Sequence, residues 1–141
     1  MMRTYSLKQL AETEKERILN LLGEALQRRP EVRFAYLFGS FVESDHFHDI
    51  DVAVYLEEGT GAMEDRWYDI RLSGELEKRG GYPIDIVILN RAPDHLVHRI
   101  SKGYLLFSRD EEFRVEFITT AWKRYLDFKP KRMAYLEEIM S

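Results

Sequence analysis

The chain has 141 residues, no cysteine and a formal net charge of −4, and hydrophobic residues make up 45% of it. This length fits one domain, so we expect a single domain over residues 1–141. The hydrophobic content excludes a disordered chain, and the lack of cysteine excludes a disulfide scaffold, a zinc ribbon and a cysteine nucleophile. Because the net charge provides no basic field for a nucleic-acid backbone, we expect no direct nucleic-acid binding.

The composition of the N-terminal region predicts the compartment. Residues 1–17 lack the apolar stretch of a signal peptide. The sequence contains no run of apolar residues long enough to span a bilayer, which takes about 18 residues or more. We therefore expect a cytoplasmic protein with no membrane partner.

The first predicted element is a helix that ends before Pro30. Ser6 with Gln9, and Thr13 with Glu16, fit the S/T-x-x-E/Q pattern of a helix N-terminus. This repetition predicts a short turn followed by a longer helix. Apolar residues at helical spacing follow, and the proline stops the helix.

Two predicted strands follow this helix. Residues 32–38 form a short apolar and aromatic run that stops at Gly39. Residues 41–48 are expected to form a loop or a single helical turn. Residues 49–56 are rich in β-branched side chains and predict the second strand, and the polar, glycine-containing segment after it breaks regular structure.

The second half of the chain alternates helices with strands. The patterns predict a helix over 63–79, a strand over 82–90, a helix over 92–102 and a strand over 104–108. A helical segment over about 110–141 ends the chain, and Pro130 is expected to interrupt it. The order of elements predicts an α/β (α+β) fold in which helices flank a small mixed sheet.

Three aspartates occur where strands disfavour them. Asp49 and Asp51 flank Ile50 at the start of a predicted strand, so their side chains point to the same face. Asp85 lies within the otherwise apolar strand IDIVIL. Converging carboxylates repel one another, and a hard divalent cation such as Mg²⁺ or Mn²⁺ relieves that repulsion. The pattern predicts a metal site made of these aspartates.

A Gly-Ser pair precedes these aspartates. Gly39 lets a bulky anion approach the backbone, and Ser40 offers a hydroxyl together with the N–H groups that follow it. The pair is not part of a Walker A loop, because the sequence has no G-x-x-x-x-G-K-[ST] pattern. A phosphate cradle beside a metal site is the arrangement of metal-assisted nucleotidyl transfer.

These motifs together resemble a known family. The segments FGSFVESDHFHDIDVAVYL, YPIDIVILNRAP and HRISKGYLLFSRDEEFR resemble minimal nucleotidyltransferases (MNT) of the DNA polymerase β superfamily. In particular they resemble the antitoxins of HEPN/MNT toxin–antitoxin pairs. The resemblance covers about residues 32–125 and implies a polymerase β-type nucleotidyltransferase fold.

The resemblance implies a role for each matching residue. Gly39 and Ser40 would hold the triphosphate of ATP. Asp49 and Asp51 would bind two Mg²⁺ ions, and Asp85 would share the catalytic ion and help to deprotonate the acceptor hydroxyl. The implied activity is transfer of AMP from ATP to a tyrosine of a HEPN ribonuclease toxin, with which the protein would form a hetero-oligomer.

Several alternatives remain open at this point. The first two aspartates could merely cap a strand, and Asp85 could form a structural ion pair with Arg71. His46 and His48 lie on a polar segment without zinc-site spacing and are expected to be solvated. The protein could also be a non-catalytic antitoxin that acts by complex formation, or a transferase for a small molecule.

A stripe of aromatic residues on the last predicted helix has two interpretations. We expect it to belong to the core, and the alternative is a surface for an oligomer or a partner. Its members are Phe113, Phe117, Trp122 and Tyr125.

Overall fold

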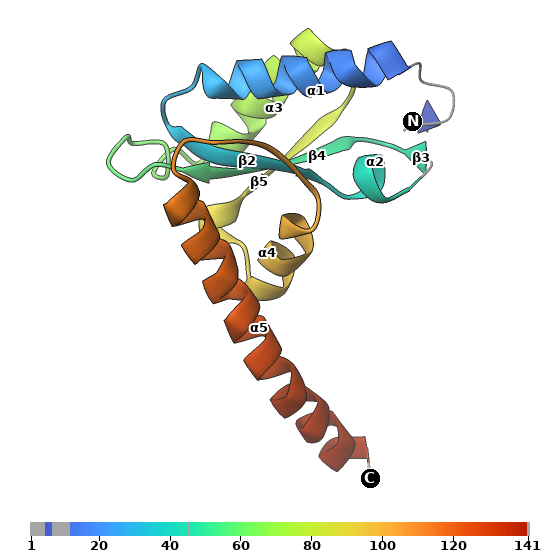
Figure 1. Ribbon diagram of the computed structural model, residues 1–141, viewed down its shortest axis with the longest axis vertical. Helices are drawn as coiled ribbons and strands as arrows, with labels where there is room; N and C mark the ends of the chain where they lie inside the picture. The colour runs from blue at the N-terminus through green and yellow to red at the C-terminus, as the bar shows by residue number, and fades with distance from the viewer. Residues whose placement is uncertain (1–4, 7–11, 45, 141) are drawn as a thin grey trace.

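The structure is a computed structural model that describes residues 5–6, 12–44 and 46–140 (Figure 1). Its first half contains β1 (Tyr5–Ser6), α1 (Glu12–Gln27), β2 (Val32–Phe38), α2 (Ser40–Glu43), β3 (His46–Phe47) and β4 (Ile50–Leu56). Its second half contains α3 (Tyr68–Gly80), β5 (Ile84–Ile88), the short 3₁₀ helix η2 (Leu89–Arg91), α4 (Asp94–Ser101), β6 (Tyr104–Ser108) and α5 (Glu111–Met140).

The central sheet has four strands in the order β5-β4-β2-β6. Strands β4 and β5 are parallel, and the other two pairings are antiparallel. Strands β1 and β3 form a separate two-stranded sheet. The prediction of an α/β fold with a small mixed sheet flanked by helices is therefore confirmed.

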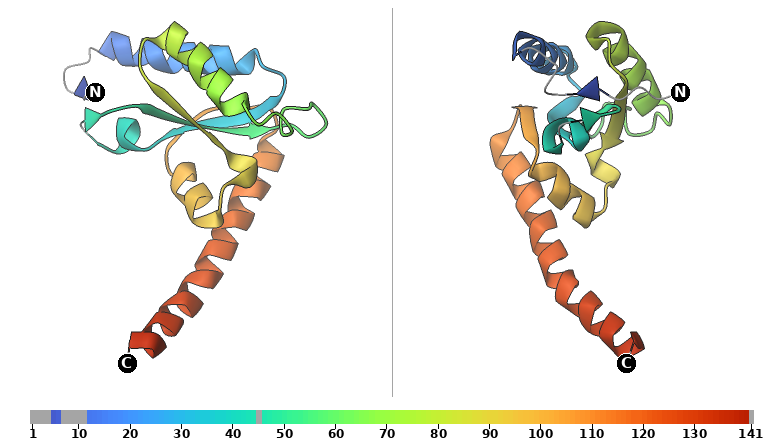
Figure 2. Two further views of the ribbon diagram at one scale, coloured as in Figure 1. Left: turned by 180° about the vertical axis from the view of Figure 1, so that it is seen from behind. Right: turned by 90° about the vertical axis from the view of Figure 1, so that its right-hand side faces the viewer.

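Helices cover both faces of the central sheet. Helices α1 and α3 lie on one face, and α4 and the first half of α5 lie on the other (Figures 1 and 2). Strand β2 is buried on both faces: Ala35 and Leu37 pack with α1 and α3, whereas Phe34 and Tyr36 pack with α4 and α5. This double burial explains why the strand is almost entirely apolar in sequence.

The N-terminal capping predictions are wrong where the structure tests them. Ser6 lies in strand β1, and Thr13 lies inside α1, which already includes Glu12. Gln9 lies outside the described residues. The backbone of Ser6 pairs with that of His46 in the β1–β3 sheet. This contact between distant residues overrides the local helix signal.

Helix α3 begins at Tyr68, five residues later than the pattern predicts. The carboxylate of Asp65 accepts a hydrogen bond of 3.1 Å from the Trp67 backbone N–H. This local turn competes with helix formation, as aspartate side chains often do. Gly81 ends the helix in a left-handed conformation with φ 82°.

Helix α5 continues through Pro130, so the expected interruption is wrong. Ile118 and Ala121 are buried in the core, but every residue from Leu126 to Met140 is exposed. This second half projects away from the body of the protein (Figures 1 and 2). Because this part of the helix is solvated, water can donate to the backbone carbonyl that the proline, which has no N–H, leaves without a hydrogen bond.

The first half of α5 confirms the core interpretation for three of the four aromatic residues of the stripe, whereas Tyr125 lies against the His98 ring of α4 with the ring centroids 4.6 Å apart. Phe113, Phe117 and Trp122 pack against the buried cluster around Phe34. Within the described ranges, no helix is long and apolar enough to cross a membrane.

Candidate active site

The register of the central sheet gathers the predicted aspartates. Asp51 pairs with Phe38 of β2 on one side and with Asp85 of β5 on the other. Asp49 precedes Asp51 by two residues. One carboxylate oxygen from each of Asp49, Asp51 and Asp85 lies within 4.8 Å of the others. We call these three residues the acidic triad.

Gly39 lies directly against the acidic triad. Its φ is +79°, and a Cβ atom at this position would lie 2.0 Å from Oδ2 of Asp51. Both observations exclude other residue types, because L-residues avoid this φ and a side chain would overlap the carboxylate. The backbone at the end of β2 is therefore bare beside Asp51.

The short helix α2 starts immediately after this glycine. The N–H groups of Val42 and Glu43 donate to the Gly39 carbonyl at 3.0 and 2.9 Å. The N–H groups of Ser40 and Phe41 precede these bonds and have no acceptor within the helix. Phe41 is buried, and its ring packs edge-on against Phe47 at 5.0 Å, which fixes α2 next to the sheet.

The acidic triad is electrostatically crowded. Burial and the charges of Asp49 and Asp85 raise the pKa of Asp51 to about 6, although the positive charge of Arg99 partly opposes them. Burial and the charge of Asp49 also raise the pKa of Asp85. Carboxylates that share a site hold their protons in this way when no cation balances them.

The chemistry of the triad fits a divalent metal ion. Its donors are three carboxylates, and such all-oxygen sets favour hard cations such as Mg²⁺ or Mn²⁺. Among the described residues, the groups close enough to hold a metal together include no histidine. His46 and His48 are exposed on the neighbouring segment.

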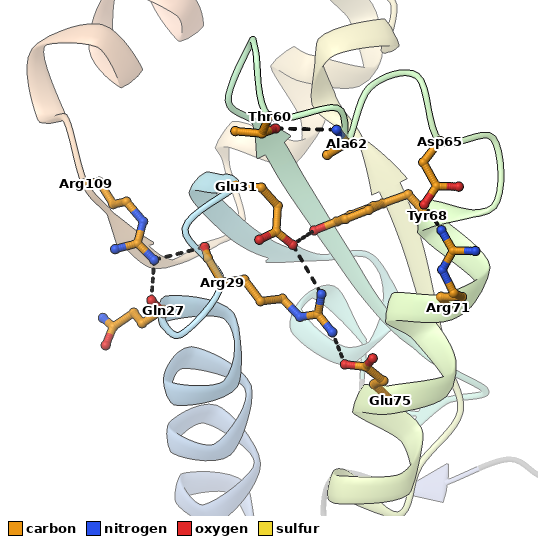
Figure 3. Close-up of polar contacts among 10 residues, drawn as sticks. All are labelled: Gln27, Arg29, Glu31, Thr60, Ala62, Asp65, Tyr68, Arg71, Glu75 and Arg109. Carbon is orange, nitrogen blue, oxygen red and sulfur yellow. Dashed lines mark hydrogen bonds and ion pairs between the residues drawn. The ribbon is translucent and has the colours of Figure 1, made fainter.

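The structural ion pair that the sequence left open for Asp85 does not form. Arg71 pairs with Asp65 instead, near the opposite end of the sheet (Figure 3). Asp85 lies within the acidic triad, and the row Phe38–Asp51–Asp85 is continuous across three strands.

The opposite end of the sheet holds a different polar cluster, around a pocket of about 430 Å³. There Glu31 accepts hydrogen bonds from the Tyr68 hydroxyl at 2.7 Å and from Arg29 at 3.2 Å (Figure 3). Burial raises the pKa of Glu31, but these hydrogen bonds outweigh it and lower the pKa overall. The acids of this cluster are balanced by arginines, unlike those of the triad.

One charged residue near the triad was missed by the sequence analysis. Arg99 of α4 forms an ion pair with Glu43 of α2, with its Nη2 atom 3.3 Å from Oε2. It lies 60 positions after Gly39, in a helix whose apolar residues have the usual helical spacing. No local sequence pattern therefore indicates that Arg99 lies beside α2.

Comparison with known proteins shows the family of the chain. The family model described as "Polymerase beta, Nucleotidyltransferase" matches residues 20–112, which include Gly39, Ser40 and the acidic triad. The chain belongs to this nucleotidyltransferase family. No curated protein matches the chain significantly.

Solved structures share the fold of this nucleotidyltransferase. A chain of a toxin–antitoxin structure with AMP-PNP is 22% identical with a TM-score of 0.70, and the match covers 87% of this chain and 98% of that one. A chain from a complex of tri-AMPylated Shewanella oneidensis HEPN toxin with MNT antitoxin is 22% identical with a TM-score of 0.64, covering 92% and 98%. A chain of a toxin–antitoxin MntA-HepT structure is 21% identical with a TM-score of 0.64, covering 93% and 100%.

Proposed function

We propose that this nucleotidyltransferase transfers AMP from ATP to a hydroxyl group of a partner protein in a Mg²⁺-dependent reaction. The observation that carries the proposal is the close approach of the bare Gly39 backbone to Asp51, one of three converging carboxylates. The glycine lets the Asp51 carboxylate lie against the end of β2, next to the N–H groups that start α2 and could meet a triphosphate, and the carboxylates provide the donors for metal ions there.

Each residue has a distinct role in this proposal. Gly39 and Ser40 hold the triphosphate through backbone N–H groups and the serine hydroxyl. Asp49 and Asp51 hold two Mg²⁺ ions, and Asp85 holds one of them from the neighbouring strand. When bound, Mg²⁺ supplies positive charge to the phosphates and makes the acceptor hydroxyl more acidic.

The proposed reaction is a displacement at the α-phosphorus of ATP. The acceptor oxygen forms a bond to that phosphorus, and the bond to the bridging oxygen of pyrophosphate breaks. The proton of the acceptor hydroxyl passes to Asp85, and pyrophosphate leaves. No oxidant or reductant is needed, and the products are the AMP-modified acceptor and pyrophosphate.

We further propose that the acceptor is a tyrosine of a cognate HEPN ribonuclease toxin and that the protein acts as its antitoxin in the cytoplasm. Chains with this fold occur in complexes named as MNT antitoxin with HEPN toxin, and one such toxin is described as tri-AMPylated. Another complex contains AMP-PNP, an analogue of ATP. These likenesses support the partner class as well as the nucleotide.

Mass spectrometry of the partner tests this proposal. A candidate HEPN toxin from the same genome is incubated with the purified protein, ATP and Mg²⁺. We expect a mass increase of one or more AMP units, mapped to a tyrosine, and none with Asp49→Asn or Asp51→Asn. A stable, inactive complex without any mass increase would instead indicate a non-catalytic antitoxin. Modification of an added small molecule but not of the protein would indicate a small-molecule transferase.

A further inference from the structure

Arg99 connects helix α4 to the cradle around Gly39. Its guanidinium forms the 3.3 Å ion pair with Glu43, the last residue of α2. The side chains of Arg99 and Glu43 are 55% and 47% exposed, so solvent and a ligand can reach both. The residues of α2 itself, SFVE, include no cation.

The backbone under Arg99 is fixed against the end of β2. A Cβ atom at Gly103 would lie 2.2 Å from the carbonyl oxygen of Leu37, so the turn after α4 abuts the strand two residues before Gly39. Val97 and Ile100 of the same helix are buried in the core. The helix therefore holds the start of the Arg99 side chain in place, while its guanidinium end is exposed to solvent.

The charge of Arg99 reaches the acidic triad. It lowers the pKa of Asp51, while the charge of Glu43 raises it. Arg99 and Glu43 therefore act on the same site with opposite signs. A triphosphate that enters this site brings several more negative charges, and these compete with Glu43 for the guanidinium.

We propose that Arg99 is a nucleotide-binding residue that exchanges its ion pair with Glu43 for the phosphate oxygens of ATP. This inference rests on the proposed function, because it assumes that the triphosphate lies beside Gly39. A guanidinium binds phosphate through paired, charge-assisted hydrogen bonds, which are stronger than an exposed ion pair with a carboxylate. Glu43 holds the side chain near the cradle in the free protein and is released when the nucleotide binds.

The affinity for MgATP, measured by calorimetry on the purified full chain, tests this exchange. We expect R99Q to weaken binding by about 10- to 100-fold, the range for charge-assisted hydrogen bonds. R99K keeps the positive charge but loses the paired N–H donors of the guanidinium, so we expect an affinity between those of wild type and R99Q. The matched control is R124Q, which removes an equally exposed arginine that pairs with Asp94 and should leave the affinity within two-fold of wild type.

The release of Glu43 has its own test. E43Q frees the guanidinium, and we expect MgATP to bind about 1.5- to 5-fold more tightly, as breaking an exposed ion pair allows. In the R99Q background this gain should shrink. An equal gain in both backgrounds would show that the two residues act independently and would overturn the exchange.

The outcomes separate this inference from the proposed function. If the wild-type protein binds MgATP and the affinity of R99Q is within two-fold of wild type, the role of Arg99 is overturned but the proposed function is not. Folded wild-type protein that binds no MgATP would overturn the proposed function and the inference with it. Thermal unfolding of each variant provides the check on folding, and we expect unchanged midpoints because Arg99 is exposed.

Discussion

Gly39 and Asp51 are so close that a methyl group on the glycine would lie 2.0 Å from a carboxylate oxygen of the aspartate. This contact joins the end of β2 to the start of β4. The glycine, which has no side chain, therefore lies directly beside Asp51, whose pKa is raised to about 6 by burial and by the charges of Asp49 and Asp85.

Replacement of Gly39 by alanine should therefore damage the protein more than a comparable replacement elsewhere. Gly61 also has a positive φ, 82°, but no atoms would contact its added Cβ. We expect G61A to cost about 1–2 kcal/mol through backbone strain alone. G39A should cost about 1–3 kcal/mol more, because Asp51 must move, and should also abolish MgATP binding. Chemical denaturation and calorimetry measure the two effects, and equal losses in both variants would contradict the contact.

Asp51→Asn should stabilise the metal-free protein at neutral pH. The folded-state pKa of Asp51, about 6, is above its ordinary value of 3.8, so the folded state binds the proton more tightly than the unfolded state does. The ionised carboxylate of Asp51 therefore destabilises the folded wild-type protein. This destabilisation is absent below about pH 4 and complete above about pH 6. After allowing for solvent screening, we expect a gain of about 1 kcal/mol at pH 7.5 that fades toward pH 4. Urea unfolding in the presence of a chelator measures it, and a less stable variant at pH 7.5 would contradict the crowding of the triad.

Asp85→Asn should separate catalysis from nucleotide binding. The variant is nearly isosteric, and Asp49 and Asp51 remain beside the cradle. We expect the affinity for MgATP to stay within a few-fold, while the rate of AMP transfer falls by at least ~10²-fold, roughly 3 kcal/mol of transition-state stabilisation. Asp69→Asn is the control, because Asp69 adds charge near Asp85 but lies outside the triad. Unchanged transfer by D85N would remove Asp85 from the reaction.

The two halves of α5 should respond differently to polar substitutions. Ile118 is 9% exposed and lies in the core, so Ile118→Ser should cost about 2–5 kcal/mol. Met133 and Leu136 are 52% and 38% exposed, so serine at both positions should change the free energy of unfolding by less than about 0.5 kcal/mol. Denaturant unfolding of the isolated protein measures both. A large loss in the double variant would mean that this half of the helix is packed in solution.

The positions of the central strands and the convergence of two aspartates could be predicted from the sequence, because both follow from simple physical rules. Strands β2, β4 and β5 carry apolar or β-branched runs whose burial the sheet requires. The predicted bounds of β2 are confirmed, whereas β4 begins one residue later than predicted and β5 is two residues shorter at each end. Because the strand predicted over 49–56 begins one residue later, Asp49 lies in the bend before β4, yet its carboxylate still converges with that of Asp51 as the two-residue period predicts. The approach of Asp85 depends on the register between β4 and β5, which a single strand does not encode.

The errors arose where side chains or tertiary contacts outweigh local propensity. Asp65 forms a turn with Trp67 that delays helix α3, and a proline in a solvated helix does not stop α5. Arg99 reaches α2 only because α4 packs against the end of β2, a contact between distant parts of the chain.

The row Phe38–Asp51–Asp85 joins residues that lie at different separations along the chain. Strands β2 and β4 join through a short connection over residues 39–49, so Gly39, Asp49 and Asp51 meet by local closure. Asp85 arrives only after the crossover through α3 brings β5 into parallel pairing, and such non-local pairing is intrinsically slow. A chain in which β5 has not yet paired with β4 therefore has only two of the three carboxylates in place, so the acidic triad depends on this crossover.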